Sequence, residues 1–554
     1  MRDQGRHIVP KRDYLPKFDS RTGAAYKMPA RFPAIYVNII DILEPTLRLA
    51  FLADRKKTIS SGNGALRTAI AVGDRKLPEQ LLKFISVAQK RPEKRDANAR
   101  RADWGEVYQD FAEAGAKTQA SRCSQCGVPF CQIHCPVQNN IPDWLMLTAS
   151  GRLEEAYEVS SATNNFPEIC GRICPQDRLC EGNCVIEKGF ESVTIGAIER
   201  HITDTAFEQG WVKPVVPTVE LPESVGIIGA GPGGLAAAEM LRHRGYQVHV
   251  YDRYDRVGGL LIYGIPNFKL EKEIVNRRAQ LLVDSGVTFH LGFEVGVDAS
   301  LEDLRKRHEA VLIATGAYAV RDIKVPGVGL DNVHQALDYL TASNRKGLGD
   351  AVPAYDDGTL DANGRDVVVI GGGDTAMDCV RTAIRQNARS VKCLYRRDRE
   401  NMPGSMQEVA HAEEEGVDFV WLSAPEAFLG DRAVDGVRVE RIHLGVADSS
   451  GRQTPQPIEG SAHTVPANMV IRALGFDPED LPVLFNAPEL ETTRWGSLLI
   501  DWATMMTSMS GVFAAGDIVR GASLVVWAIK DGRDAAASIH RYINARQQTL
   551  AAAS

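Results

Sequence analysis

The sequence predicts an α/β fold: two domains built on parallel βαβ units, one inserted in the other, preceded by a small helical domain. The first observation is a glycine-rich turn between a short apolar strand and a helix at 224–245, and the second is a repeat of that design at 366–386. The third is that eight of the ten cysteines lie between Cys123 and Cys184, among segments with helical apolar spacing. Strand–turn–helix units of this kind indicate Rossmann-like sheets, which bind ligands at the carboxyl ends of their strands.

Length and composition limit the class of protein. A chain of 554 residues predicts three or four domains, and 44% hydrophobic with 24% charged residues is ordinary for a globular protein. No run of 18 apolar residues is present, so we expect no membrane span. The N-terminus is polar and basic without a following apolar core, which predicts no secretory signal and a cytoplasmic protein. The formal net charge of −7 argues against a nucleic-acid partner.

The domain organisation follows from shifts in these patterns. Residues 1–76 carry 15 Lys/Arg against 7 Asp/Glu and no convincing motif, so we expect a poorly ordered extension; a basic arm for an acidic partner is the alternative. The remaining boundaries are predicted as a helical domain at 77–214, a first Rossmann-like domain at 215–330 and 477–546, and an inserted domain at 331–476. The last residues, 547–554, are expected to fray.

The helical domain is predicted from short apolar patterns. These indicate a surface arm at 89–102 and helices at 104–119, 141–150 and 152–160. The cysteines then fall on the loops between helices, where a metal centre can collect ligands from several directions.

The cysteines form two groups. The first is Cys123-x2-Cys126-x4-Cys131-x3-Cys135-Pro, and the second is Cys170-x3-Cys174-Pro-x4-Cys180-x3-Cys184. Disulfides would suit a secreted chain, and zinc prefers two CxxC pairs with a longer gap. A cysteine run closed by Cys-Pro is typical of iron–sulfur clusters, in which the last cysteine often serves the other cluster. We therefore predict iron–sulfur clusters.

The first glycine-rich turn predicts dinucleotide binding. It reads Gly229-Ala-Gly231-Pro-Gly-Gly234, between a strand at 224–228 and a helix at 235–245. Gly229 makes the tight turn, Gly231 admits a pyrophosphate, and Gly234 allows the helix to pack on the strand. Asp252 ends the second strand, where a carboxylate holds a ribose hydroxyl and repels a 2′-phosphate. FAD, which has no such phosphate, is therefore predicted here.

The second turn predicts a different dinucleotide. It reads Gly371-Gly-Gly373-Asp374-Thr375-Ala376, between a strand at 366–370 and a helix at 375–386. The strand that follows, 390–395, ends in Arg396-Arg397 in place of an acid. Two guanidiniums suit a 2′-phosphate, which predicts NADPH; a solvated basic pair is the alternative.

Three further segments fit a flavin enzyme. The strand at 311–316 ends in Ala-Thr315-Gly316, the strand at 469–475 ends in Ala-Leu-Gly, and 511–517 reads Gly-Val-Phe-Ala-Ala-Gly516-Asp517 before a helix at 524–542. Asp517 can reach a ribityl chain, and the N-terminus of the helix that follows can stabilise negative charge on a reduced flavin. The order of the segments predicts that the second domain is inserted in the first, with the chain crossing back near Gly475.

Together these residues resemble the small (beta) subunit of bacterial NADPH-dependent glutamate synthase. The resemblance covers about 77–545 and is carried by Cys-Ser-Gln-Cys-Gly-Val-Pro-Phe-Cys at 123–131, by Asn-Asn-Phe-Pro-Glu-Ile-Cys-Gly-Arg-Ile-Cys-Pro at 164–175, by Gly-Gly-Leu-Leu-Ile-Tyr-Gly-Ile-Pro at 258–266 and by Phe-Ala-Ala-Gly-Asp at 513–517. It also places Gly259 among the cofactor-binding residues. It implies two interleaved [4Fe-4S] clusters, one on Cys123, Cys126, Cys131 and Cys184, the other on Cys135, Cys174, Cys180 and Glu199. Spacing alone equally allows Cys170 in place of Glu199.

The resemblance implies that the chain oxidises NADPH at FAD and passes electrons through the clusters to a large (alpha) subunit. That partner would make L-glutamate from L-glutamine and 2-oxoglutarate. No catalytic side chain is predicted, because hydride transfer depends mainly on orientation. The same module in a ferredoxin:NADP transhydrogenase or another NADPH-dependent reductase is one alternative. A zinc-bound docking module joined to a nucleotide sensor is the other.

Overall fold

The computed structural model describes residues 81–449, 451 and 453–553, so the expected N-terminal extension at 1–76 lies outside them. Within the described residues, a helical domain precedes two five-stranded sheets. Of the helices in this part of the chain, none combines the length and the apolar character needed to cross a membrane.

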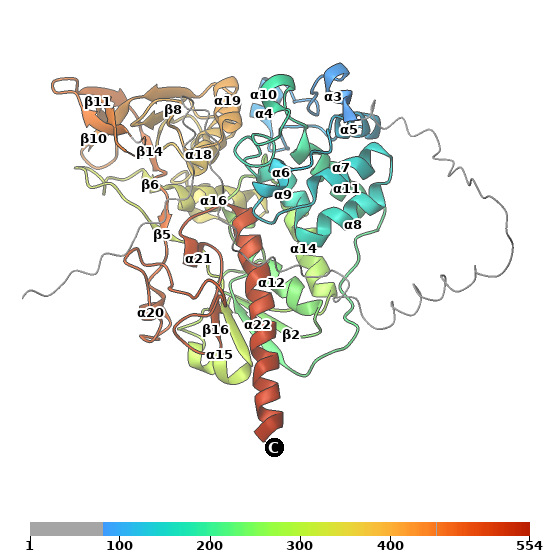
Figure 1. Cartoon of the computed structure of the whole chain (residues 1–554). Helices are drawn as coiled ribbons and strands as arrows, with labels where there is room; N and C mark the ends of the chain where they lie inside the picture. The colour runs from blue at the N-terminus through green and yellow to red at the C-terminus, as the bar shows by residue number, and fades with distance from the viewer. Residues whose placement is uncertain (1–80, 450, 452, 554) are drawn as a thin grey trace, which may run out of the picture. The chain divides into compact units, whose positions relative to one another are not determined.

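The helical domain consists of short helices (Figure 1). Its helices are α3 (Lys83–Ser86), α4 (Ala97–Ala102), α5 (Glu113–Ala120), α6 (Phe130–Ile133), α7 (Ile141–Ala149), α8 (Leu153–Thr163), α9 (Pro167–Ile173), α10 (Glu187–Phe190) and α11 (Ile195–Glu208). Six of the eight cysteines of the domain lie on connecting segments as expected, but Cys131 lies in α6 and Cys170 in α9. Trp144 of α7 and Ile198 of α11 are fully buried in its core, and five of the cysteines pack against that core. Burial of such side chains stabilises the domain by about 2 kcal/mol each.

Three expectations were wrong: one for a helix, one for the charged arm and one for the C-terminal tail. The helix expected at 104–119 begins only at Glu113, because Val107 and Gln109 pair their backbones with Glu93 and Arg95 instead. The arm at 89–102 is not wholly on the surface, since Arg100 is 1% exposed and bonds Glu415. The tail expected to fray from 547 continues as helix to Ala553.

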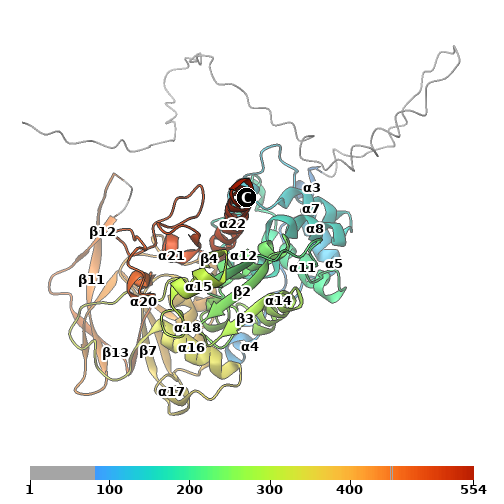
Figure 2. The same cartoon turned by 90° about the horizontal axis from the view of Figure 1, so that it is seen from below.

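The first sheet has the strand order β16-β4-β1-β2-β3, with all neighbours parallel. Its strands are β1 (Ser224–Ile228), β2 (Gln247–Asp252), β3 (Thr288–Leu291), β4 (Ala310–Ile313) and β16 (Val512–Ala514). Its helices are α12 (Pro232–Arg242), α13 (Leu260–Tyr263), α14 (Lys272–Asp284), α15 (Leu301–Arg307), α21 (Asp517–Arg520) and α22 (Val525–Ala553). The long α22 lies beside α12 in both views (Figures 1 and 2).

The second sheet repeats this arrangement with the order β6-β14-β7-β8-β9, again parallel. It is formed by β6 (Val333–Gln335), β7 (Asp366–Ile370), β8 (Ser390–Tyr395), β9 (Asp418–Trp421) and β14 (Met469–Arg472), with helices α16 (Ala336–Gly347), α17 (Pro353–Asp356), α18 (Asp374–Arg385) and α19 (Met406–Glu414). An antiparallel sheet of β10 (Ser423–Leu429), β11 (Gly436–Ala447), β12 (Gln453–Pro457) and β13 (His463–Pro466) follows β9.

The insertion predicted from the order of motifs is confirmed by the strand order. β16 comes from the end of the chain and pairs with β4 of the first sheet, so the second sheet interrupts the first. The two connecting segments run side by side: β5 (Ala319–Val320) pairs antiparallel with β15 (Phe476–Asp477), one residue after Gly475, and α20 (Leu481–Leu484) follows.

Candidate functional site

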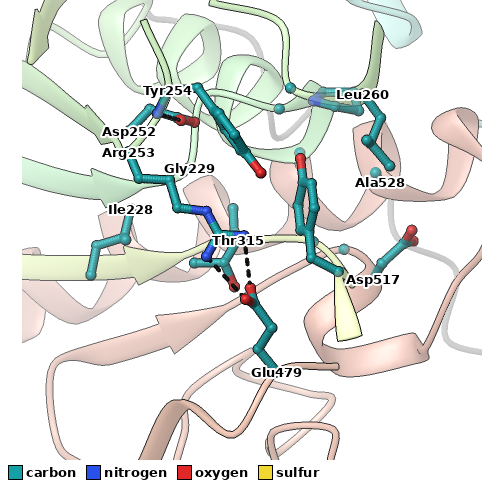
Figure 3. Close-up of a pocket in the computed structure, with 18 of the residues that line it drawn as sticks. Ile228, Gly229, Asp252, Arg253, Tyr254, Leu260, Thr315, Glu479, Asp517 and Ala528 are labelled. Carbon is teal, nitrogen blue, oxygen red and sulfur yellow. Dashed lines mark hydrogen bonds and ion pairs between the residues drawn. The ribbon is translucent and has the colours of Figure 1, made fainter. Parts of the chain in front are cut away.

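A first pocket lies at the carboxyl ends of β1, β2, β4 and β16, where parallel sheets bind ligands (Figure 3). It gathers side chains and backbone from segments nearly 300 residues apart in the sequence. Nine of the residues predicted from the sequence line it: Gly229, Gly231, Asp252, Gly259, Thr315, Gly316, Thr375, Gly516 and Asp517.

The glycines of the first turn have separate structural reasons. Gly229 has φ +112°, and a Cβ there would lie 2.3 Å from the carbonyl oxygen of Ala314. A Cβ on Gly234 would lie 2.0 Å from the carbonyl oxygen of Gly229, so this residue packs behind the pocket and does not line it. Gly231 has no atom within 4 Å of its Cβ position, which leaves room for a ligand against the backbone.

Asp252 is tied to the turn it faces. Its Oδ2 accepts a hydrogen bond of 2.6 Å from the N–H of Ala230, and its Oδ1 accepts one of 2.8 Å from the N–H of Tyr254. Burial raises the pKa of this carboxyl above its usual range. Each oxygen keeps a second lone pair, so Asp252 can still accept a ribose hydroxyl while it holds the turn.

Sequence reasoning missed an ion pair on the wall of this pocket. Arg253 donates to both carboxylate oxygens of Glu479 at 3.0 and 3.1 Å, as the dashed lines in Figure 3 show. The guanidinium also lies 5.0 Å from the ring centre of Tyr318, whose pKa is raised by burial. Arg253 follows Asp252 directly, but Glu479 lies beyond the inserted domain, so no local pattern pairs them.

The far wall of the first pocket fits a flavin dinucleotide. The buried hydroxyl of Thr315 has no hydrogen-bond partner among the described residues, which leaves it available to a ligand. Asp517 accepts a 2.6 Å hydrogen bond from Ser523, and burial raises its pKa. Leu524, Val525 and Ala528 also line the pocket, so α22 begins at its edge.

The second turn repeats the first with one additional requirement. Gly371 has φ +146°, and its Cβ would lie 2.2 Å from the carbonyl oxygen of Ala473. Gly373 is open, as Gly231 is. The middle glycine, Gly372, was not identified from the sequence; its Cβ would lie 2.3 Å from the ring of Tyr395.

The remaining residues of the second turn lie in three different environments. Asp374 accepts a 2.9 Å hydrogen bond from the N–H of Ser405, Thr375 lines the first pocket, and Ala376 is fully buried in the core of its own domain. Arg396 is exposed and Arg397 half-buried at the end of β8, and neither side chain has an ion-pair or hydrogen-bond partner among the described residues.

A second pocket lies where the three domains meet. Cys174 and Arg172 from the helical domain line it with Leu524 and Val525 of the first Rossmann-like domain and Asp374, Asp378 and Glu408 of the inserted one. Leu524 and Val525 line the first pocket too, so the two pockets are neighbours. Lys269 bonds Asp378 at 2.8 Å across this junction, and burial still raises the pKa of Asp378 to about 6.

The first cysteine set comes together around a small pocket of its own. Cys123, Cys126, Cys131 and Cys184 line it with Pro129, Phe130, Leu145 and Ile195 among their neighbours. Burial raises the pKa of Cys123 to about 11 and that of Cys131 to about 12, so these side chains would be held as thiolates only with a cation beside them.

Five side chains lie near one another at the second set, because both candidates for the fourth ligand are there. Cys135, Cys174 and Cys180 interact electrostatically with Glu199, and Cys170 lies beside Cys174. Glu199 is buried, and its Oε1 accepts hydrogen bonds from Asn139 at 3.1 Å and from Asn164 at 3.0 Å.

The spacing of both sets bears on the kind of metal centre. Among the described residues, no three His, Cys, Asp or Glu side chains converge as the ligands of one metal ion do. In a four-iron cluster each ligand binds a different iron, so its ligands stand farther apart than those of one zinc ion. The four cysteines that line the small pocket supply the number and kind of ligands that a four-iron cluster binds.

Comparison with protein families gives two matches. The family described as dihydropyrimidine dehydrogenase domain II, 4Fe-4S cluster, matches residues 100–211. The family described as pyridine nucleotide-disulphide oxidoreductase matches residues 223–532, more than half of the chain.

Individual proteins extend these matches. The glutamate synthase [NADPH] small chain of Azospirillum brasilense is 68% identical over 471 residues, which are 85% of this chain and 98% of that protein. The protein of the same name from Escherichia coli is 43% identical over 472 residues, 84% of this chain and all of that one. Mycobacterium tuberculosis FprA in complex with NADPH shares the fold at a TM-score of 0.51 and 19% identity, over 60% of this chain and 86% of its own.

Proposed function

The chain belongs to the family of glutamate synthase [NADPH] small chains, and from that premise we propose that it is the electron-input subunit of this enzyme. It is an NADPH-dependent oxidoreductase with a pyridine nucleotide-disulphide oxidoreductase domain and a 4Fe-4S domain. The proposed reaction takes electrons from NADPH and delivers them to a large subunit, which makes L-glutamate from L-glutamine and 2-oxoglutarate.

FAD is assigned to the first pocket. Gly229, Gly231 and Gly259 would leave the backbone open to its pyrophosphate, Asp252 would accept from a ribose, and Thr315, Gly316, Gly516 and Asp517 would hold the ribityl chain and ring. When bound, FAD supplies the acceptor for a hydride and releases the two electrons singly. The residues of the chain orient the two dinucleotides, and we assign none of them as an acid or base.

NADPH is assigned to the second turn, at Gly371, Gly373, Asp374, Thr375 and Ala376, with Arg396 and Arg397 toward the 2′-phosphate. The observation that carries this proposal is the position of Thr375, which belongs to the second turn and lines the first pocket together with Gly259 and Gly516. A nicotinamide held near Thr375 would therefore reach the pocket assigned to the flavin.

Two [4Fe-4S] clusters are assigned to the two ligand sets. The second pocket supports their order, because Cys174 of the second set shares it with Leu524 and Val525 of the first pocket. Electrons would pass from the first pocket to the set of Cys135, Cys174, Cys180 and Glu199, and from there to the set of Cys123, Cys126, Cys131 and Cys184. We place the enzyme in the cytoplasm, because clustered thiols are stable in a reducing compartment.

The division of labour is tested with the purified chain, with and without its large subunit. Alone, it should reduce an artificial acceptor with NADPH and form no glutamate from glutamine and 2-oxoglutarate; addition of the large subunit should give glutamate in proportion to NADPH consumed. Cys126→Ala should abolish glutamate formation and leave reduction of flavin by NADPH intact. Glutamate made by the single chain, or none made with the partner present, would refute the proposal.

A further inference from the structure

Glu199 is held by two amides that come from different parts of the helical domain. Asn139 precedes α7 and Asn164 follows α8, and both are 1% exposed. Their Nδ2 atoms lie 3.1 and 3.0 Å from the same atom, Oε1 of Glu199. Since a buried carboxylate needs donors, this pair satisfies one oxygen completely and leaves the other to a different partner.

The orientation of both amides is fixed by groups that can only donate. The indole N–H of Trp144 donates to Oδ1 of Asn139 at 3.2 Å, and the backbone N–H of Phe166 donates to Oδ1 of Asn164 at 3.1 Å. A flipped amide would set two donors against each other at either position. The NH₂ groups must therefore face Glu199.

Oε2 of Glu199 accepts no hydrogen bond from the described residues, and Glu199 is near enough to Cys135, Cys174 and Cys180 to interact electrostatically with their thiols. An oxygen that has no donor and lies near three thiols is available to a cation. An iron of the proposed cluster would be such a cation, and the two amides occupy Oε1 and leave Oε2 for it.

Asn164 also distinguishes the two candidates for the fourth ligand. Its Oδ1 lies 3.7 Å from Sγ of Cys170, within hydrogen-bond range for sulfur, and accepts from the thiol. The hydrogen bond engages the Cys170 thiol with an amide and not with a metal ion. Asn164 thus donates to Glu199 on one side and accepts from Cys170 on the other.

We propose that Asn139 and Asn164 are positioning residues that present Glu199, and not Cys170, as the fourth ligand of the second cluster. The proposal rests on the two clusters assigned above and adds the means by which a carboxylate is selected over a nearby cysteine. Hydrogen bonds to a ligand also tune the reduction potential of the cluster, so these amides should influence the potential of the second cluster and not that of the first.

The test measures iron and the low-temperature electron paramagnetic resonance spectrum of the reduced full-length chain. Asn164→Asp and Asn139→Asp replace donors by a second carboxylate and should lose about half of the roughly eight irons expected for two clusters. The signal of the second cluster should disappear while that of the first remains. Cys170→Ala should keep all the iron and both signals. Asn140→Ala is the matched control, because Asn140 neighbours Asn139 but its side-chain amide donates to the exposed Asp143 and not to Glu199.

Should the Asp variants fail to fold, Asn164→Ala removes the donors without adding charge and should shift the potential of the second cluster alone. Native iron content with unchanged spectra and potentials in the Asn139 and Asn164 variants would overturn the proposal, and so would loss of half the iron from Cys170→Ala. Failure of the underlying function is distinguishable, since the wild-type chain would then contain about four irons or zinc.

Discussion

The two Rossmann-like sheets have the same strand order and the same turn, but they handle charge in opposite ways. Gly229 and Gly371 both have positive φ and both meet a carbonyl oxygen of the neighbouring strand, while Gly231 and Gly373 are both open. The backbone therefore provides two equivalent dinucleotide cradles. What distinguishes them is the residue at the end of the second strand. In the first sheet it is a buried Asp252 bonded to its own turn, and in the second it is Arg396, which is exposed and without a partner in the described chain.

The contrast extends into the two cores. In the first domain, burial raises the pKa of both Asp252 and Asp517. In the inserted domain, burial alone would raise the pKa of Glu415, but hydrogen bonds from Arg381 and Arg385 outweigh it and lower that pKa to about 2. Burial thus dominates at Asp252 and Asp517, whereas pairing with arginine dominates at Glu415.

The largest effect is expected where the two turns are equivalent. Gly229→Ala and Gly371→Ala each place a Cβ within 2.3 Å of a backbone oxygen at positive φ, which costs several kcal/mol. Gly229→Ala should lose the flavin absorbance, whereas Gly371→Ala should keep it and lose more than about a hundredfold in NADPH affinity. Anaerobic reduction followed by stopped-flow absorbance measures both. Gly347→Ala, with no atom near its Cβ position, is the control; loss of flavin from Gly371→Ala would contradict the assignment.

The second effect is a difference between the two domains in their sensitivity to acid. The pKa of Glu415 is about 2 in the folded chain against 4.5 for a free side chain, so its contribution is present above pH 4.5 and is lost as the pH falls toward 2. The full shift corresponds to about 3 kcal/mol. Between pH 5.5 and 3.5, hydrogen exchange, corrected for its intrinsic pH dependence, should rise in α18 and α19 before it rises in β1 and β2. Glu415→Gln should be less stable at pH 5.5 and largely insensitive to this change; equal acid sensitivity in that variant would exclude Glu415 as the cause.

The smallest of the three effects concerns the choice of nicotinamide. Arg396→Ala or Arg397→Ala removes charged hydrogen bonds to a 2′-phosphate worth about 1.5–3 kcal/mol, so the NADPH affinity should fall about ten- to a hundredfold and the NADH affinity hardly at all. Steady-state kcat/KM with both nucleotides measures the ratio. Arg399→Ala is a suitable control, because its guanidinium is already paired with Glu413 at 2.7 Å. A wild-type ratio in both Arg396 and Arg397 variants would mean that other residues select the nucleotide.

Local patterns predicted the sheets well, because strand and turn depend on adjacent residues. The strands at 224–228, 366–370 and 390–395 have the bounds expected from their apolar runs. The helix expected at 104–119 does not begin at 104, because the backbone of residues 107–109 forms hydrogen bonds with residues 93–95 instead. Arg253–Glu479 and Arg100–Glu415 could not be predicted, since each joins residues more than 200 positions apart. The glycines and cysteines were identified from the sequence. Asn164 stands in the motif at 164–175, but neither it nor Asn139 was given a role, because no local pattern joins an asparagine to Glu199.

The short ladder between β5 and β15 affects the order in which the chain folds. β16 pairs with β4 through Ala514 and Ile313, about 200 residues apart, and closing so long a loop is entropically costly. Once the inserted sheet has formed, Val320 lies opposite Phe476, and the effective loop shrinks to about 45 residues. The entropic cost of closing the loop then falls by about 1.3 kcal/mol, roughly ninefold in the chance of contact. If the inserted domain folds first, its β5–β15 pairing brings the two connecting segments together, and β16 can then pair with β4 at a lower entropic cost.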